Sequence, residues 1–168
     1  MSLMSSLLHN LRLLLIAAWL GAAIFFSAAV APTAFQVARA FNLSNTGEVA
    51  GAMVSRTLVI INISGFVISV SVILLSLLLK KYYKTSSFVA QLVLLMVVLV
   101  STAVGEWIIA ARMRDLRTAM TIPIEQVATG DPMRVAFQAL HGYSVAALSV
   151  AIIAALIAFI FMAQRRAT

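Results

Sequence analysis

Four long apolar runs alternate with short polar segments along the chain. The runs cover about residues 13–31, 57–79, 87–111 and 139–163. A helix needs about 20 apolar residues to cross roughly 30 Å of hydrocarbon, so each run is long enough to span a bilayer. No stretch alternates apolar and polar positions as a membrane strand does. Because lipid offers backbone groups no other partner, the pattern predicts an all-α four-helix bundle, a single transmembrane domain over residues 1–168.

Two of the connections are too long to be simple turns. Pro32 is expected to kink or end the first span. Beyond it, Phe35, Ala38 and Phe41 recur at near-helical spacing, which predicts a short amphipathic helix at the membrane surface. The next helix is expected to start near Gly47 and to continue into the second span.

The second long connection also carries helix signals. Residues 111–119 are expected to prolong the third span into water. Asp131 followed by Pro132 is typical of a helix start, with Asp131 as the N-cap and Pro132 at the first helical position. The bundle is therefore expected to carry short interfacial helices on this side, which we call the outer side.

Composition agrees with a membrane protein. Hydrophobic residues make up 63% of the chain and charged residues only 10%, whereas a soluble domain carries about a quarter charged residues. The chain has no cysteine, which excludes disulfides and thiolate metal sites. The net charge of +7 does not indicate nucleic acid, because the basic residues cluster at the ends of the apolar runs, where they meet lipid head groups.

The basic residues also predict an orientation. The turn between the second and third runs carries Lys80, Lys81 and Lys84 and no acid, so the positive-inside rule places it in the cytoplasm. Both termini are then cytoplasmic, and Arg165 and Arg166 agree. We expect an integral protein of the plasma (inner) membrane, with its two longer connections on the outer side.

Small and polar positions indicate where the helices pack. Ser55, Asn62, Ser69 and Ser76 recur every seven residues in the second run, with Gly65 beside them. This spacing keeps them on one side of the helix and predicts a packing seam. Ala17 with Gly21 in the first run, and Ala147, Ala151 and Ala155 in the fourth, also allow close approach.

Glu106 lies inside the third apolar run, six residues before Arg112 and so about 9 Å deeper in the membrane. An ionised side chain at mid-membrane costs on the order of 3 kcal/mol, so Glu106 is expected to face the bundle and to have a partner. Asn62, Arg56 and His141 belong to the same end of the bundle. The candidate pocket is Trp19, Pro32, Phe35, Arg56, Asn62, Glu106 and His141.

Simpler interpretations stay open for both titratable residues. Glu106 could form an ordinary ion pair with Arg112 or Arg56, and His141 could hydrogen-bond Glu106 or a backbone carbonyl. His141 is also a candidate single axial ligand for haem, for chlorophyll magnesium or for another metal. His9 is expected at the cytoplasmic interface, too far from His141 for one haem to bind both. No HExxH, Walker or GxSxG motif indicates an enzyme.

Short patterns resemble a known family. Trp19-Leu20-Gly21, then Ala31-Pro32-Thr33-Ala34-Phe35, and later the stretch from Phe137 through His141 to Ser144, resemble transmembrane protein 205 and its uncharacterised bacterial relatives. The resemblance covers about residues 11–162. It implies a four-span bacterial membrane protein, with Trp19, Gly21, Pro32, Phe35 and His141 as signature positions, and it implies no established reaction.

Two functions follow as hypotheses. The first is a non-enzymatic accessory or interaction subunit of a larger membrane complex, in contact with membrane lipid and with other subunits or further copies of the chain. The second is a membrane protein or transporter that binds a metal, a porphyrin or a small molecule through Asn62, Glu106 and His141.

Overall fold

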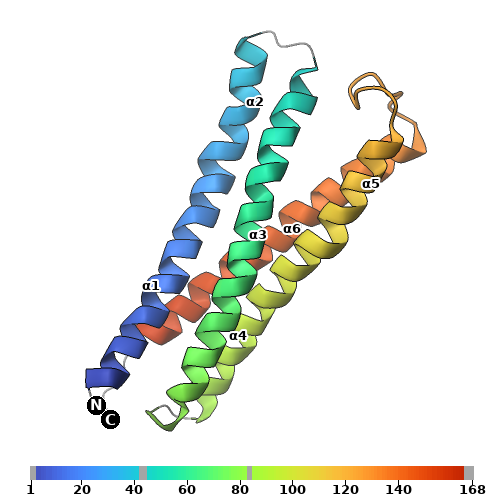
Figure 1. The fold of residues 1–168 in the computed structure, drawn as a ribbon. Helices are drawn as coiled ribbons and strands as arrows, with labels where there is room; N and C mark the ends of the chain where they lie inside the picture. Colours follow the sequence, from blue (N-terminus) through green and yellow to red (C-terminus); the bar gives the residue numbers. More distant parts are fainter. Residues whose placement is uncertain (1–2, 42–44, 83–84, 165–168) are drawn as a thin grey trace.

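The protein is built of long helices, as a computed structural model shows (Figure 1). The structure describes residues 3–41, 45–82 and 85–164. These residues form helices and connecting turns and contain no strand, which confirms the all-α prediction. The elements are α1 (Leu3–Phe25), η1 (Phe26–Val30), α2 (Ala31–Ala40), α3 (Thr46–Leu78), η2 (Lys80–Tyr82), α4 (Thr85–Ala103), η3 (Val104–Ala110), α5 (Ala111–Ala119) and α6 (Pro132–Ala163).

Several elements run on without a break, so that the described residues form four continuous helices long and apolar enough to cross a membrane. They are 38, 33, 35 and 32 residues long. At about 1.5 Å per residue, each exceeds roughly 45 Å and extends beyond the hydrocarbon. The four are Leu3–Ala40, Thr46–Leu78, Thr85–Ala119 and Pro132–Ala163.

Pro32 was expected to kink or end the first span, and the second alternative is wrong, because one helix continues from Leu3 to Ala40. The short helix expected after Pro32 is present as α2, but it continues α1 through η1. Five residues of π-helix, η1, immediately precede α2. Proline removes one hydrogen bond and crowds the preceding turn, and a wider π-turn accommodates both effects. The helix therefore passes Pro32 without ending.

Long helices that follow one another in the sequence run in opposite directions. In Figure 1, α1 begins and α6 ends at the same end of the bundle as η2, and α6 crosses behind α3. α4 packs against α3 and α6, while α1 packs against α3 and α6. The small residues Ala151, Ala155 and Ala158 of α6 are fully buried, and the first two confirm the packing face expected there.

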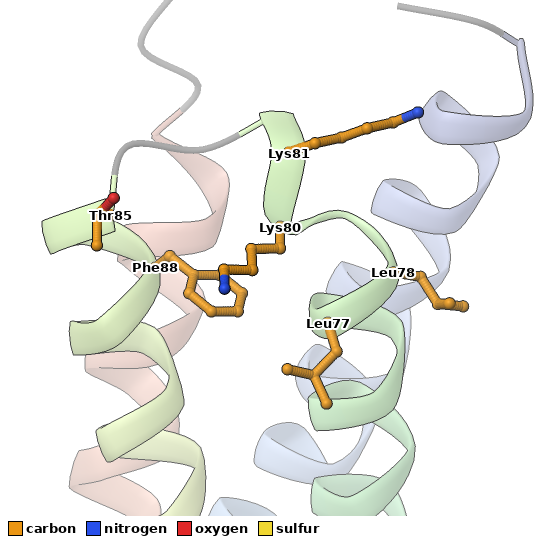
Figure 2. Close-up of a pocket in the computed structure, with 6 residues that line it drawn as sticks. All are labelled: Leu77, Leu78, Lys80, Lys81, Thr85 and Phe88. Atoms are coloured by element: carbon orange, nitrogen blue, oxygen red, sulfur yellow. The ribbon is translucent and has the colours of Figure 1, made fainter.

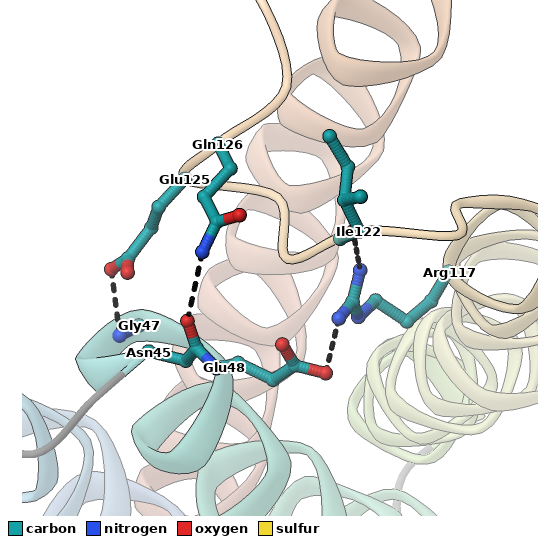
Figure 3. A network of polar contacts seen from close by, with 7 residues as sticks. All are labelled: Asn45, Gly47, Glu48, Arg117, Ile122, Glu125 and Gln126. Carbon is teal, nitrogen blue, oxygen red and sulfur yellow. Dashed lines mark hydrogen bonds and ion pairs between the residues drawn. The ribbon is translucent and has the colours of Figure 1, made fainter.

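Polar contacts tie the outer ends together (Figure 3). Glu48, in the first turn of α3, forms an ion pair with Arg117 of α5. Glu125 Oε1 accepts a hydrogen bond from Gly47 N at 2.7 Å, and Gln126 Nε2 donates to Asn45 Oδ1 at 3.2 Å. The segment between α5 and α6 is thereby fastened to the start of α3.

The start of α6 follows its predicted pattern. Asp131 Oδ1 accepts hydrogen bonds from Met133 N at 2.7 Å and Arg134 N at 3.4 Å, so Asp131 is the N-cap and Pro132 stands at the helix start. This confirms the cap prediction. Proline is suited to that position because the first backbone N–H groups of a helix have no intrahelical acceptor.

Candidate functional site

The polar seam of α3 faces the bundle interior. Asn62, Ser69 and Ser76 are buried, which confirms three of the four positions expected from their seven-residue spacing, whereas Ser55 is exposed. Ser55 belongs to the part of α3 that precedes the second apolar run. Among these four positions, the buried seam therefore begins at Asn62.

Two glycines bring neighbouring helices onto this seam. A Cβ atom at Gly65 would lie 2.7 Å from Trp19 Nε1 and 2.9 Å from Thr102 Cγ2. A Cβ atom at Gly105 would lie 3.3 Å from Asn62 Nδ2. The absent side chains thus let α1 and the α4–η3 helix approach α3 closely, and they place Trp19, Asn62 and the residue before Glu106 in one region.

Trp19 is buried and bonded across the helix interface. Its side chain is 2% exposed, and its Nε1 donates to the backbone carbonyl of Ile61 at 2.9 Å. A buried indole N–H requires such a partner. Trp19 therefore fixes α1 against α3 at the level of Asn62.

Glu106 is buried, as the sequence predicts, but its partner is a different arginine. The residue is 5% exposed and lies in the π-helical segment η3. Its Oε1 accepts from Arg114 Nη1 at 3.1 Å, so the ion pair expected with Arg112 or Arg56 forms with Arg114 instead. The other oxygen, Oε2, is buried and has no hydrogen-bond partner among the described residues.

The π-helical segment explains this pairing. Residues eight apart in a regular α-helix differ by about 80° around the axis, because each residue turns the helix by about 100°. A π-turn accommodates one extra residue, which takes up about 100° and leaves Glu106 and Arg114 about 20° apart. The two side chains thereby come onto one face of a continuous helix.

The remaining candidate residues lie elsewhere. Pro32, Arg56 and His141 are exposed, and Phe35 is half-buried. The structure thus gathers Trp19, Asn62 and Glu106 and places the other four predicted pocket residues on outer faces or at partly covered positions. In the described part of the chain, no group of three or more His, Asp or Glu side chains is placed to hold a metal ion. A haem, chlorophyll or metal on His141 stays a prediction.

A second buried polar group, which the sequence patterns did not predict, lies at the opposite end of the bundle. Arg12 and His9 are 0% and 1% exposed, Arg12 Nη1 donates to Ser76 Oγ at 3.0 Å, and His9 Nδ1 lies 3.4 Å from Arg12 Nη2. His9, expected at the interface, is thus inside the bundle. The available signal was spacing, because both residues continue the buried positions Ile16, Trp19 and Ala23 at intervals of three and four.

The same end of the bundle carries an open pocket of about 470 Å³. Figure 2 shows Lys80 reaching across Phe88 and Lys81 pointing away from it. Exposed lysines beside the apolar side chains of Leu77 and Leu78 are typical of a membrane surface that meets anionic head groups. Lys84, Arg165 and Arg166, which also support the predicted orientation, lie outside the described residues.

These features define the class of protein as an integral membrane protein of the all-α type, with four helices in the described residues able to span a bilayer. Residues 14–121 match the family model of a domain of unknown function, DUF4149, and the chain belongs to this family. The matched region contains Trp19, Asn62, Glu106 and Arg114 and ends before His141. No curated protein and no solved structure matches the chain.

Proposed function

We propose that this membrane protein binds a small ligand beside Glu106 and Asn62, in the outer half of the bundle. The observation that carries the proposal is the buried Glu106 Oε2, which has no hydrogen-bond partner among the described residues. Ionisable side chains inside a membrane are costly and mark functional sites by default. A free carboxylate oxygen facing the interior is therefore a natural acceptor for a bound group.

An ordinary structural ion pair accounts less well for this geometry. Arg114 binds only one carboxylate oxygen, although a guanidinium commonly binds both in a bidentate pair. The side chain of Arg114 is also 57% exposed, whereas that of Glu106 is 7% exposed. A pair that is half outside the bundle contributes little stability, and it leaves the second oxygen unsatisfied.

The test compares ligand retention in matched variants. Wild-type protein, Glu106→Gln and Asp115→Asn are purified from membranes in mild detergent and analysed by native mass spectrometry. Asp115 is an exposed acid on α5 and serves as the control. A bound mass is expected in the wild type and in Asp115→Asn and is expected to be lost in Glu106→Gln. Equal bound mass in all three, or none in the wild type, would contradict the proposal.

An interaction subunit is the second candidate, favoured by a face of α1 that the described residues leave uncovered. Ala17 and Gly21 were expected to pack within the bundle, yet both are exposed, and no described atom lies within 4 Å of a Cβ at Gly21. Small residues at this spacing allow a helix of another chain to approach. The resemblance to transmembrane protein 205 relatives supports a four-span protein of the bacterial plasma membrane and leaves the partner unassigned.

The second candidate is tested at that face. Gly21→Leu fills it, whereas Gly142→Leu alters an equally exposed glycine on α6. If α1 binds a partner or another copy, Gly21→Leu should shift the detergent-solubilised complex to a lower mass and Gly142→Leu should not. The same mass for the wild type and Gly21→Leu would exclude this face as the contact.

A further inference from the structure

The two carboxylate oxygens of Glu106 have different surroundings, and this difference indicates the kind of ligand that the site binds. Oε1 is held by Arg114 Nη1 at 3.1 Å, while Oε2 is buried without a partner among the described residues. Only one N–H of the Arg114 guanidinium is used on this carboxylate, although the group carries five donors in a planar fork. The carboxylate can therefore accept a second N–H donor, or a different donor altogether.

We infer that the ligand is a small organic cation, an ammonium or guanidinium compound, that displaces Arg114 from Glu106. Arg114 is then a tethered counter-ion that occupies the cation position while the site is empty of ligand. This inference rests on the proposed function and names the class of ligand that the same site takes.

Charge balance favours displacement over addition. Glu106 and Arg114 neutralise each other in the structure. A cation added beside the intact pair would leave a net positive charge next to a buried carboxylate, and an anion would face that carboxylate directly. Exchange of one cation for another keeps the buried site neutral, as buried charges require.

Because Arg114 is exposed, its exchange for another cation costs little free energy. Its side chain is already 57% exposed, so less than half of its surface remains to be uncovered when it leaves Glu106. A fully buried partner would instead have to be rehydrated completely. Release of Arg114 costs mainly its single hydrogen bond to Oε1, which the incoming N–H donor replaces.

The direction of the Arg114 side chain provides the route of entry. Side chains on a helix lean toward its N-terminus, which for Arg114 means toward Glu106. Its side chain accordingly extends back along the helix from the outer end, and its Nη1 reaches Oε1 of Glu106. In this proposal, outward movement of Arg114 opens a passage from the outer side to the carboxylate.

Asn62 contributes the second recognition group. Its amide lies beside Gly105, the residue before Glu106, and carries an oxygen acceptor. The site thus offers oxygen acceptors from two groups, the charged carboxylate of Glu106 and the neutral amide of Asn62. Such a pair suits a cation with several N–H donors. A divalent metal would need more anionic or imidazole ligands than the described residues bring together here.

The test uses methylguanidinium as the probe and N-methylurea as its neutral analogue of similar shape. Binding is measured by calorimetry on the wild type, Arg114→Ala, Arg112→Ala and the double variant Arg114→Ala/Glu106→Gln. Removing the tethered competitor should raise the affinity for methylguanidinium about tenfold or more, because the competent state becomes fully populated. Arg112 is an exposed arginine on the same helix, and Arg112→Ala should bind like the wild type.

The double variant should lose the gained affinity, and N-methylurea should bind none of the proteins. Binding by the double variant equal to that of Arg114→Ala would overturn the inference. A failure of Arg114→Ala to bind would also overturn it, provided that Arg114→Gln fails as well. Arg114→Gln removes the charge but keeps part of the side chain, in case alanine impairs folding. If these variants fail while Glu106→Gln still loses the native ligand, the proposed function stands and only the cation assignment falls.

Discussion

Gly65 of α3 and Trp19 of α1 are in direct contact, so that a Cβ atom at Gly65 would lie 2.7 Å from both Cε2 and Nε1 of the indole. The ring cannot easily withdraw, because Nε1 is bonded to the carbonyl of Ile61 and the side chain is buried. Thr102 of α4 closes the third side, at 2.9 Å from the same position. Three helices therefore meet at one glycine, directly below the candidate site.

The first prediction concerns this contact. Gly65→Ala should lower the free energy of unfolding by about 1–3 kcal/mol, because the added methyl overpacks a closed interface. The measurement is thermal unfolding of the purified protein in detergent. Gly51→Ala on the same helix is the control: no described atom lies near its Cβ, and alanine should be neutral or stabilise the helix by up to about 1 kcal/mol. An equal loss in both variants would show that the contact with Trp19 is unimportant.

The second prediction isolates the indole hydrogen bond. Trp19→Phe removes the donor to Ile61 and leaves an aromatic ring, so it should destabilise by about 1 kcal/mol from the hydrogen bond and more from the lost ring volume. Trp107→Phe is the matched control, because Trp107 is 53% exposed and meets Phe66 edge to face at 4.9 Å between ring centroids. Unfolding by chemical denaturant, followed by circular dichroism, compares the two. A larger loss in Trp107→Phe would refute the role given to Trp19.

Much of the architecture follows from sequence because it reflects simple lengths and periods. The thickness of the bilayer sets the length of each apolar run, and the runs accordingly lie in the four long helices. A seven-residue period keeps polar groups on one side, and Asn62, Ser69 and Ser76 are buried as that period predicts. Such features depend on local spacing alone.

The incorrect and missed assignments have a common physical origin, because they depend on which face of a helix each residue occupies. A π-turn carries no clear sequence signal, yet it allows the helix to pass Pro32 and rotates Arg114 onto the face of Glu106. The burial of Arg12 and His9 was not predicted, because polar residues are rarely buried, although their spacing continues the buried face of α1. Contacts between side chains of different helices depend on how the helices are arranged around one another. The local sequence of one helix does not specify that arrangement.

The third prediction concerns the start of α6. Asp131→Ala should lower stability by about 1 kcal/mol, because it leaves the backbone N–H groups of Met133 and Arg134 without their acceptor. Asp131→Asn keeps a side-chain oxygen and should retain nearly all of the stability. Thermal unfolding of the two variants in the same detergent gives the comparison. If alanine and asparagine behave alike, the loss comes from the charge and not from the cap.

The fourth prediction concerns the orientation in the membrane, which we propose from the lysines at η2. Thr121 and Ser86 are exposed and lie at opposite ends of the bundle, since Thr121 follows α5 and Ser86 is in the first turn of α4 (Figure 1). Because the chain has no cysteine, Thr121→Cys and Ser86→Cys each introduce a single thiol into a background that cannot react.

The positive-inside rule places Lys80 and Lys81, and with them Ser86, in the cytoplasm. A membrane-impermeant maleimide added to intact cells should therefore label Thr121→Cys, whereas Ser86→Cys should react only after the membrane is permeabilised. Labelling in the reverse order would invert the proposed topology. It would also move the passage to Glu106 to the cytoplasmic side, because Arg114 and Thr121 lie at the same end of the third long helix.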